Sequence, residues 1–142
     1  MTVGRVCTRI VVTAHPQETA QAAATRMAQY DVGTLIVVEA NKPVGIITDR
    51  DLVLRVMAKN HNPQEVAVKA AMTDNPVCVS EHMALAEALV LMRGYRVRRL
   101  VVINDKKDLV GVLALDDLLL LLSEEQQAVA GLMRAARGHR GE

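Results

Sequence analysis

The chain has 142 residues, which is enough for one compact domain or for two small repeats that share a core. Its apolar fraction of 51% excludes a chain that is disordered throughout, and its formal charge of +1 supplies no long-range field that selects nucleic acid or an anionic membrane. The sequence contains neither an apolar run of membrane-spanning length nor a signal-peptide pattern, so we expect a cytoplasmic protein that does not bind a membrane.

The first half of the chain predicts a β-α-β-β-α succession. A short β-branched run at 9–13 precedes a polar start and an Ala-rich helix over 19–30. Two continuously apolar runs, 34–39 and 44–48, predict strands of a sheet that is covered on both faces. A second helix is expected over 49–58, followed by a linker with a short helical patch.

The second half of the chain repeats the first. Tyr30 matches Tyr95 and Leu35 matches Leu100, each at an offset of 65 residues. Gly45 matches Gly111 at an offset of 66, so one residue has been inserted in a polar turn, where a hairpin tolerates it. The second set of elements is predicted at 76–79, 84–95, 100–104, 109–114 and 116–123.

These repeats predict an α/β (α+β) fold in which two β-α-β-β-α units pack sheet to sheet with pseudo-two-fold symmetry. A C-terminal helix should follow, capped by Ser123 and running to about residue 137. Its Val129, Leu132 and Met133 are expected to pack on the body or on a second chain. The expected domains are a first repeat at 5–65, a second repeat at 66–122, and a helix and tail at 123–142.

A turn that occurs once in each repeat carries the functional signal. The sequence GIITDRDL spans 45–52, and GVLALDDL at 111–118 has Ala114 where the first copy has Thr48. A carboxylate such as that of Asp51, at the start of a helix, can accept hydrogen bonds from the two hydroxyls of a ribose. The Thr48 hydroxyl and the helix N-terminus suit a phosphate. The alternative is that Thr48 and Asp51 only cap the helix.

With the paired turns, the internal repeat and the segment AAMTDNPV at 70–77, the chain resembles a tandem CBS-domain protein over residues 5–122. The resemblance implies a free-standing regulatory module, not an enzyme, that needs no cofactor and forms a homodimer. Its regulatory ligand would contain adenosine, as AMP, ADP, ATP, NAD and S-adenosylmethionine do. Binding between the repeats would pass a signal to an unknown downstream protein by a conformational change.

The resemblance also implies two clefts of unequal strength. The first and stronger cleft would be formed by Ile46, Thr48, Arg50, Asp51, Pro76, Val77, Arg98 and Arg99. The second would use Gly33, Thr34 and Asp117 with the backbone of residues 10–12. Ala114 brings no hydroxyl to this second cleft, so we expect it to be weak or empty.

Other functions are disfavoured by the residue pattern. The four histidines are scattered without metal-ligand spacing, Cys7 and Cys78 are expected to be buried free thiols, and no catalytic motif is present. Nucleic-acid binding through Arg134, Arg137, His139 and Arg140 lacks aromatic stacking platforms. The alternative to a ligand sensor is a ligand-free dimerisation or interaction scaffold.

Overall fold

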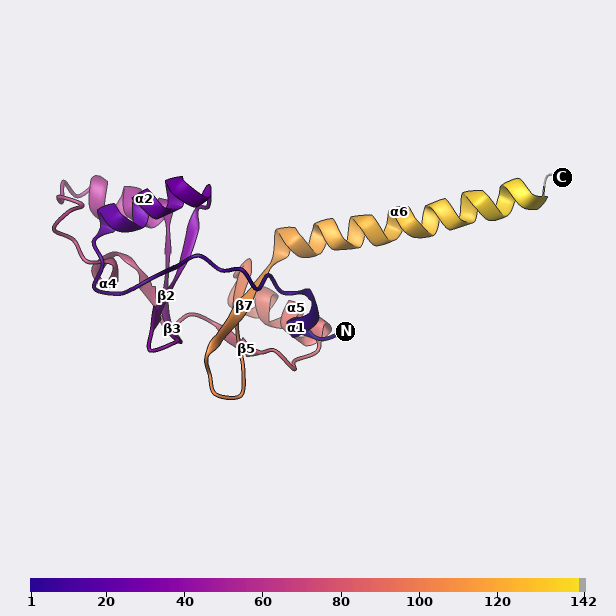
Figure 1. Cartoon of the computed structure of the whole chain (residues 1–142), viewed down its shortest axis with the longest axis horizontal. Helices are drawn as coiled ribbons and strands as arrows, with labels where there is room; N and C mark the ends of the chain where they lie inside the picture. Colours follow the sequence, from indigo (N-terminus) through magenta and orange to yellow (C-terminus); the bar gives the residue numbers. More distant parts are fainter. Residues whose placement is uncertain (141–142) are drawn as a thin grey trace.

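The computed structural model describes residues 1–140 and contains two lobes, each built on a small sheet, followed by one long helix (Figure 1). The elements in chain order are α1 (Val3–Val6), β1 (Thr13–Ala14), α2 (Ala20–Tyr30), β2 (Thr34–Glu39), β3 (Lys42–Thr48), α3 (Asp49–Asp51), the π-helix η1 (Leu52–Met57), α4 (Val68–Ala71), β4 (Thr73–Asp74), β5 (Cys78–Ser80), α5 (Leu85–Tyr95), β6 (Arg99–Ile103), β7 (Leu109–Ala114) and α6 (Leu115–Arg140).

The two sheets repeat one arrangement, in agreement with the predicted α/β fold. In the first, with order β1-β2-β3-β4, β1 is parallel to β2 and β2 pairs antiparallel with β3. In the second, with order β5-β6-β7, the same parallel and antiparallel pairings recur. Both hairpins carry a register shift at matching points, between Val37 and Val38 and between Val102 and Ile103.

Each lobe has its own apolar core between its helices and its sheet. In the first lobe, Ala23 and Met27 of α2 pack near Leu35 and Ile47. Thr19 caps α2 because its hydroxyl accepts a hydrogen bond from the Ala22 N–H at 3.1 Å. Aliphatic and Met side chains fill both cores, as expected for a chain whose only aromatic residues are two tyrosines.

The two lobes exchange short helical segments. Helix α1, at the start of the chain, packs in the second core, where Val3 is fully buried. Helix α4, from the connection between the repeats, packs in the first core, where Val68 is fully buried. After α1, Thr8 forms two backbone hydrogen bonds with Val112 of β7, both 2.9 Å. Each lobe is therefore completed by a segment that lies outside its own β-α-β-β-α unit.

The tips of the two hairpins also connect the lobes. The Leu109 N–H donates to the Asn41 carbonyl at 2.9 Å. Beside this bond, the Lys42 ammonium pairs with the Asp108 carboxylate and donates to the Lys106 carbonyl. The lobes are thus held together at the hairpin ends of their sheets.

Four local predictions were wrong. The C-terminal helix does not begin at Ser123, which lies inside the continuous helix α6, because residues 115–122 contain no helix breaker. The helix expected over 49–58 is one turn of α-helix followed by a π-helix, in which the Ala58 N–H donates to the Val53 carbonyl. The strand expected at 9–13 begins only at Thr13. The tail expected at 138–142 was wrong for residues 138–140, which continue α6, and residues 141–142 lie outside the described residues.

Candidate functional site

A cavity of about 310 Å³ lies between the two repeats. The first repeat contributes the backbone segment 10–12 and the start of β2 with Gly33 and Thr34. The second contributes Ala114 at the end of β7 and two carboxylates at the start of α6. The full lining is Thr8, Ile10, Val11, Val12, Val32, Gly33, Thr34, Ile36, Arg99, Val112, Ala114, Asp116 and Asp117.

This cavity brings together the three residues predicted for the second cleft, Gly33, Thr34 and Asp117. It also contains Arg99, which the sequence analysis assigned to the first cleft. The other residues predicted for the first cleft lie outside it: Ile46, Thr48, Arg50, Asp51, Pro76, Val77 and Arg98. A guanidinium, two carboxylates and an apolar wall therefore share the space between the repeats.

Asp117 is positioned by the N-terminal segment of the chain. The Thr8 hydroxyl donates to Oδ2 of Asp117 at 3.3 Å, and Thr8 itself is fixed to β7 by its backbone bonds with Val112. The other carboxylate oxygen, Oδ1, takes no part in this bond. A carboxylate held at a helix start beside a cavity can accept hydrogen bonds from a ligand with vicinal hydroxyls.

Asp116 and Arg98 form an ion pair at the rim of the cleft. Nη2 of Arg98 lies 2.7 Å from Oδ1 of Asp116, and both side chains are about 70% exposed. A pair this exposed contributes little to stability because water screens it. Because the Leu115 N–H also donates to the Arg98 carbonyl, the start of α6 is tied to the start of β6.

Thr48 and Asp51 form a reciprocal capping box in the first repeat. The Thr48 hydroxyl accepts from the Asp51 N–H at 3.2 Å, and Oδ2 of Asp51 accepts from the Thr48 N–H at 2.9 Å. Nε of Arg55 lies 3.8 Å from Oδ1 of Asp51. Both functional groups thus have local partners, as in the helix-cap interpretation of this turn, and Arg50 beside them is exposed.

The remaining residues predicted for the first cleft have structural neighbours. Ile46 of β3 pairs with Thr73 of β4, in the sheet of the first lobe. Val77 packs against the core of the second lobe, and Pro76 before it is half-buried. They remain predicted ligand contacts.

Thr8 is a site residue that the sequence analysis missed. Applying the repeat offset of 65 upstream aligns Thr8 with Thr73, and Val3 of α1 with Val68 of α4. The same offset identifies the N-terminal segment as the counterpart of the segment that precedes the second repeat. That signal was present in the sequence.

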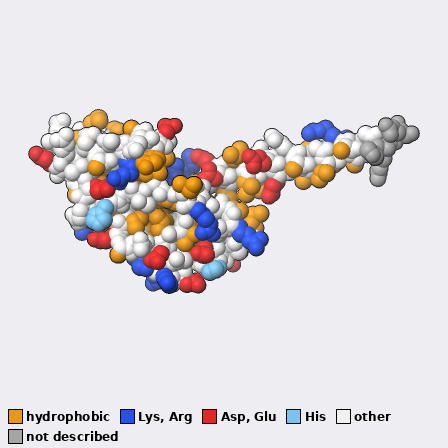
Figure 2. All heavy atoms as spheres, viewed as in Figure 1, with side chains coloured by type: hydrophobic (Ala, Val, Ile, Leu, Met, Phe, Trp, Pro, Cys, Tyr) orange, Lys and Arg blue, Asp and Glu red, His pale blue; other side chains and the backbone are white. Residues whose placement is uncertain are grey.

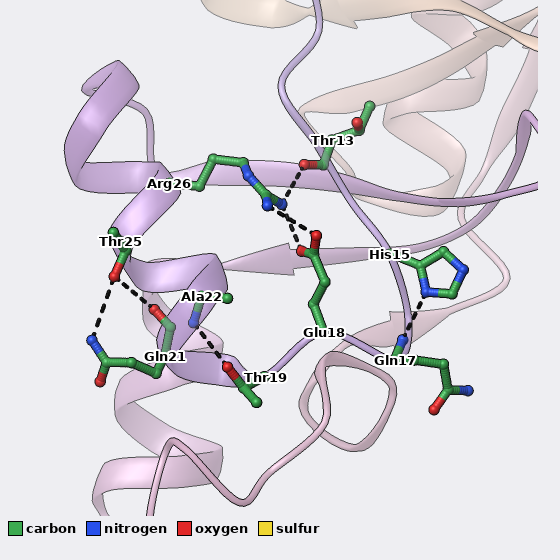
Figure 3. A network of polar contacts seen from close by, with 9 residues as sticks. All are labelled: Thr13, His15, Gln17, Glu18, Thr19, Gln21, Ala22, Thr25 and Arg26. Atoms are coloured by element: carbon green, nitrogen blue, oxygen red, sulfur yellow. Dashed lines mark hydrogen bonds and ion pairs between the residues drawn. The ribbon is translucent and has the colours of Figure 1, made fainter.

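A second hollow, of about 710 Å³, lies on the other side of the segment Ile10–Val12, which lines both spaces. Its wall contains an ion pair between Arg26 of α2 and Glu18, which lies just before that helix: Nη1 of Arg26 lies 2.6 Å from Oε2 of Glu18, and Nη2 lies 2.9 Å from Oε1 (Figure 3). The Arg26 guanidinium also donates to the Thr13 carbonyl at 2.9 Å. This network anchors the chain directly after the cleft segment.

The Arg26–Glu18 pair also changes the acid–base properties of its members. The hydrogen bond from Arg26 holds the pKa of the Glu18 carboxyl below its ordinary value, since it stabilises the charged form. In the second lobe, partial burial raises the pKa of the Cys7 thiol. Cys7 and Cys78 are both free, but the expectation that both are buried was wrong, because Cys7 is half-buried and Cys78 is exposed.

The described residues offer neither a metal cluster nor a membrane-spanning helix. Within residues 1–140, no cluster of three or more His, Cys, Asp or Glu side chains is arranged to hold a metal ion. Within the same range, no helix has both the length and the apolar composition needed to cross a bilayer.

Comparisons with known proteins agree on one family. The model of the CBS domain matches residues 3–58 and 68–124. The protein MK0525 of Methanopyrus kandleri is 38% identical over 120 residues, which are 84% of this chain and 61% of that protein, so this chain spans less than two thirds of that relative.

Solved structures share the fold. A protein with CBS domains from Burkholderia ambifaria MC40-6 is 26% identical, with a TM-score of 0.77 over 89% of this chain and 96% of that one. The CBS domain protein PAE2072 from Pyrobaculum aerophilum, solved in complex with AMP, is 25% identical, with a TM-score of 0.72 over 82% of this chain and 89% of that one.

Proposed function

The chain belongs to the family of CBS-domain proteins, and we propose that it is a regulatory module that binds an adenosine-containing ligand between its two repeats. The observation that carries this proposal is the 310 Å³ cavity into which both repeats contribute residues. Its volume lies at the lower end of the range for small-molecule sites, about 300–1,000 Å³. The AMP complex of the similar protein PAE2072 supports the choice of ligand class.

The chemistry of the cavity favours a phosphate-bearing ligand such as AMP. The Asp117 carboxylate suits the two hydroxyls of a ribose, and the Arg99 guanidinium suits a phosphate. The apolar side chains of Val11, Val12 and Ile36 offer a surface for the adenine ring. S-adenosylmethionine has no phosphate and carries a net positive charge, so AMP, ADP and ATP rank above it, and NAD is the larger alternative.

The cleft predicted around Thr48, Asp51 and Arg98 remains a second candidate site. For a ligand to bind there, Oδ1 of Asp51, which now lies near Arg55, must accept its hydrogen bonds, or Asp51 must leave its capping box. We therefore propose the Asp117 cleft as the first binding site and the Asp51 cleft as the weaker one, with each carboxylate as the marker of its own site.

Helix α6 is the element through which we propose that the signal leaves the cleft. It begins beside the cavity with Asp116 and Asp117 and extends away from both lobes (Figure 1). A ligand that binds one relative placement of the lobes more tightly shifts the population toward it and moves α6 with it. We also propose a homodimer through the lobes, supported by exposed apolar side chains on η1 and α5: Val53, Leu54, Met57, Leu89 and Val90.

The test is isothermal calorimetry and thermal-shift measurement with AMP, ATP, NAD and S-adenosylmethionine. We expect AMP to raise the melting temperature of the native chain and of the control variant Asp105→Ala, which removes an exposed hairpin carboxylate. Asp117→Ala should abolish most of the binding, whereas Asp51→Ala should leave most of it. The reverse pattern would move the main site to the first cleft.

A second variant tests the role assigned to Arg99. Arg99→Gln should weaken AMP binding by about tenfold or more and leave adenosine binding nearly unchanged, because only AMP presents a phosphate to the lost charge. Absence of binding by all four ligands would contradict the sensor proposal. It would favour the alternative function, a ligand-free interaction scaffold.

A further inference from the structure

The second half of helix α6 projects away from both lobes (Figure 1), and several of its large apolar side chains are exposed. Leu118, in the first turn, is buried against the second lobe. Farther along, Val129 is 56% exposed, Leu132 72% and Met133 57%. An isolated helix with large apolar side chains in water gains its stability from a partner rather than from its own backbone.

These side chains form one face of the helix. With about 100° of rotation per residue, Leu122, Val129, Leu132, Met133 and Ala136 fall within an arc of about 100°. Glu125 falls in the same arc, before Val129, whereas Gly131 and Gln127 lie outside it. The apolar face is therefore of the kind that packs against another helix.

The distribution of charges along α6 indicates which helix packs against its apolar face. All acidic residues of the described helix, Asp116, Asp117, Glu124 and Glu125, lie in its first half, whereas Arg134 and Arg137 lie in its second half. Figure 2 shows the same order along the projecting helix, with red side chains near the lobes and blue ones farther out. We propose that α6 pairs antiparallel with α6 of a second copy of this chain.

Antiparallel pairing satisfies charge and space together. When the pair is centred between Ala130 and Gly131, Val129 of one copy lies at the level of Leu132 of the other, and Glu125 lies at the level of Ala136, next to Arg137 of the other. The two Leu118 residues are then about 37 Å apart along the axis, so the lobes lie at opposite ends of the pair and this contact is separate from the homodimer proposed through the lobes. A parallel pair places the lobes side by side and sets acidic residues beside acidic residues, which is unfavourable.

Distances between spin labels test the orientation. Ser123→Cys and Gly131→Cys are each made in a full chain that also carries Cys7→Ser and Cys78→Ser. Across an antiparallel pair, labels at 131 lie at nearly the same level, whereas labels at 123 are offset by about 22 Å along the axis. We therefore expect the distance between copies at 131 to be shorter than that at 123 by roughly 10 Å.

Two results from the labels overturn the proposal. Equal distances at the two positions indicate a parallel pair. The absence of a coupling between copies at position 131 indicates that α6 does not pair with itself. Circular dichroism of each labelled chain checks that the fold is retained.

Charge reversal tests the basis of the pairing. Sedimentation of the full chain at low salt should show the α6-dependent step of association weakened at least about tenfold by Glu125→Lys, and equally by Arg137→Glu. Combining the two changes restores opposite charges across an antiparallel pair and should recover this step. Unchanged association in both single variants contradicts the proposal, as does a combined variant in which this step remains lost.

Discussion

The two turns at 45–52 and 111–118 occupy equivalent places in the two repeats, yet their carboxylates have different partners. Asp51 closes a capping box with Thr48, one turn away in sequence. Asp117 follows Ala114, and its hydrogen bond comes from Thr8, which is 109 residues away. The same carboxylate position is thus bound locally in one repeat and by a distant segment in the other.

This difference shows what the hydroxyl of Thr48 does in the structure. It fixes the first turn of α3 and, with it, the orientation of Asp51. Ala114 leaves the corresponding position without a hydroxyl, and the cavity between the repeats opens at Asp117. In the sequence, the hydroxyl missing at Ala114 suggested a weaker site. In the structure, the carboxylate of the same turn, that of Asp117, faces the cavity.

The largest effect is expected from adding a methyl group at the glycine of each turn. A Cβ at Gly111 would lie 2.5 Å from the Thr8 carbonyl oxygen, so the backbone of the N-terminal segment would have to move. At Gly45 the nearest atom is Sδ of Met72, in a flexible side chain, although the Thr73 carbonyl oxygen lies 3.0 Å away. We expect Gly111→Ala to cost about 3 kcal/mol and Gly45→Ala about 1.5 kcal/mol in urea denaturation. Equal costs would contradict the difference between the two contacts.

A smaller effect is expected from exchanging the capping residues. Thr48→Ala removes the cap of α3 and should lower the free energy of unfolding by about 1 kcal/mol, measured by chemical denaturation. Ala114→Thr supplies the missing hydroxyl to α6 and should raise stability by a few tenths of a kcal/mol, on the order of a weak cap. Thr48→Ser is the matched control and should be nearly neutral. Stabilisation by Thr48→Ala would contradict the capping geometry.

An acid-dependent effect is expected in the first lobe alone. Glu18 and Arg26 form an ion pair there, whereas the second repeat has Met83 and Leu91 at the equivalent positions. Because the pKa of Glu18 is lowered by folding, its stabilisation is complete above the unfolded value, about 4.3, and is lost as the pH falls through the folded value. Glu18→Gln should therefore remove up to about 1 kcal/mol of stability at pH 7 and little at pH 3.

Denaturation at both pH values measures this effect. Glu39→Gln, which changes an exposed glutamate at the end of β2, is the control and should alter neither value. A Glu18→Gln variant that loses the same stability at pH 3 and pH 7 would show that the carboxylate charge contributes nothing.

The smallest effect is expected at the helix ends. Asp31 and Arg96 follow α2 and α5 at equivalent positions, and both have a left-handed backbone, with φ of 54° and 55°. Aspartate tolerates this conformation better than arginine, because its short side chain can bond to the nearby backbone. Arg96→Gly should therefore raise the melting temperature, with a gain of about 0.5 kcal/mol, and Asp31→Gly should gain less. The opposite ranking would contradict this explanation.

Most of the fold could be predicted because the repeat and the apolar runs specify it. Strands β2 and β7 have the predicted bounds, since each is a continuous apolar run that adjoins the polar turn of its hairpin. Helix α1 was missed because four residues carry no helical periodicity, although its match with α4 was visible at the repeat offset. Ser123 was misread because a good capping residue does not begin a helix when the preceding residues already form one.

The candidate site could be predicted less completely. The sequence identified Asp117, Gly33 and Thr34 as one group, and the structure gathers them around one cavity. It did not indicate that Arg99 would reach that cavity, because the position of Arg99 depends on how the two lobes pack. Local pattern determines the position of a residue in its own repeat, whereas a site between repeats also depends on their relative placement.

The exchanged segments have a consequence for how the protein forms during synthesis. The first lobe takes all of its parts from residues 12–74, so it can complete its core while the rest of the chain is still being made. The second lobe needs Val3 and Thr8 from the start of the chain, and Thr8 must wait until Val112 has emerged. The segment around Thr8 therefore finds its place only after β7 has emerged, about a hundred residues of translation later.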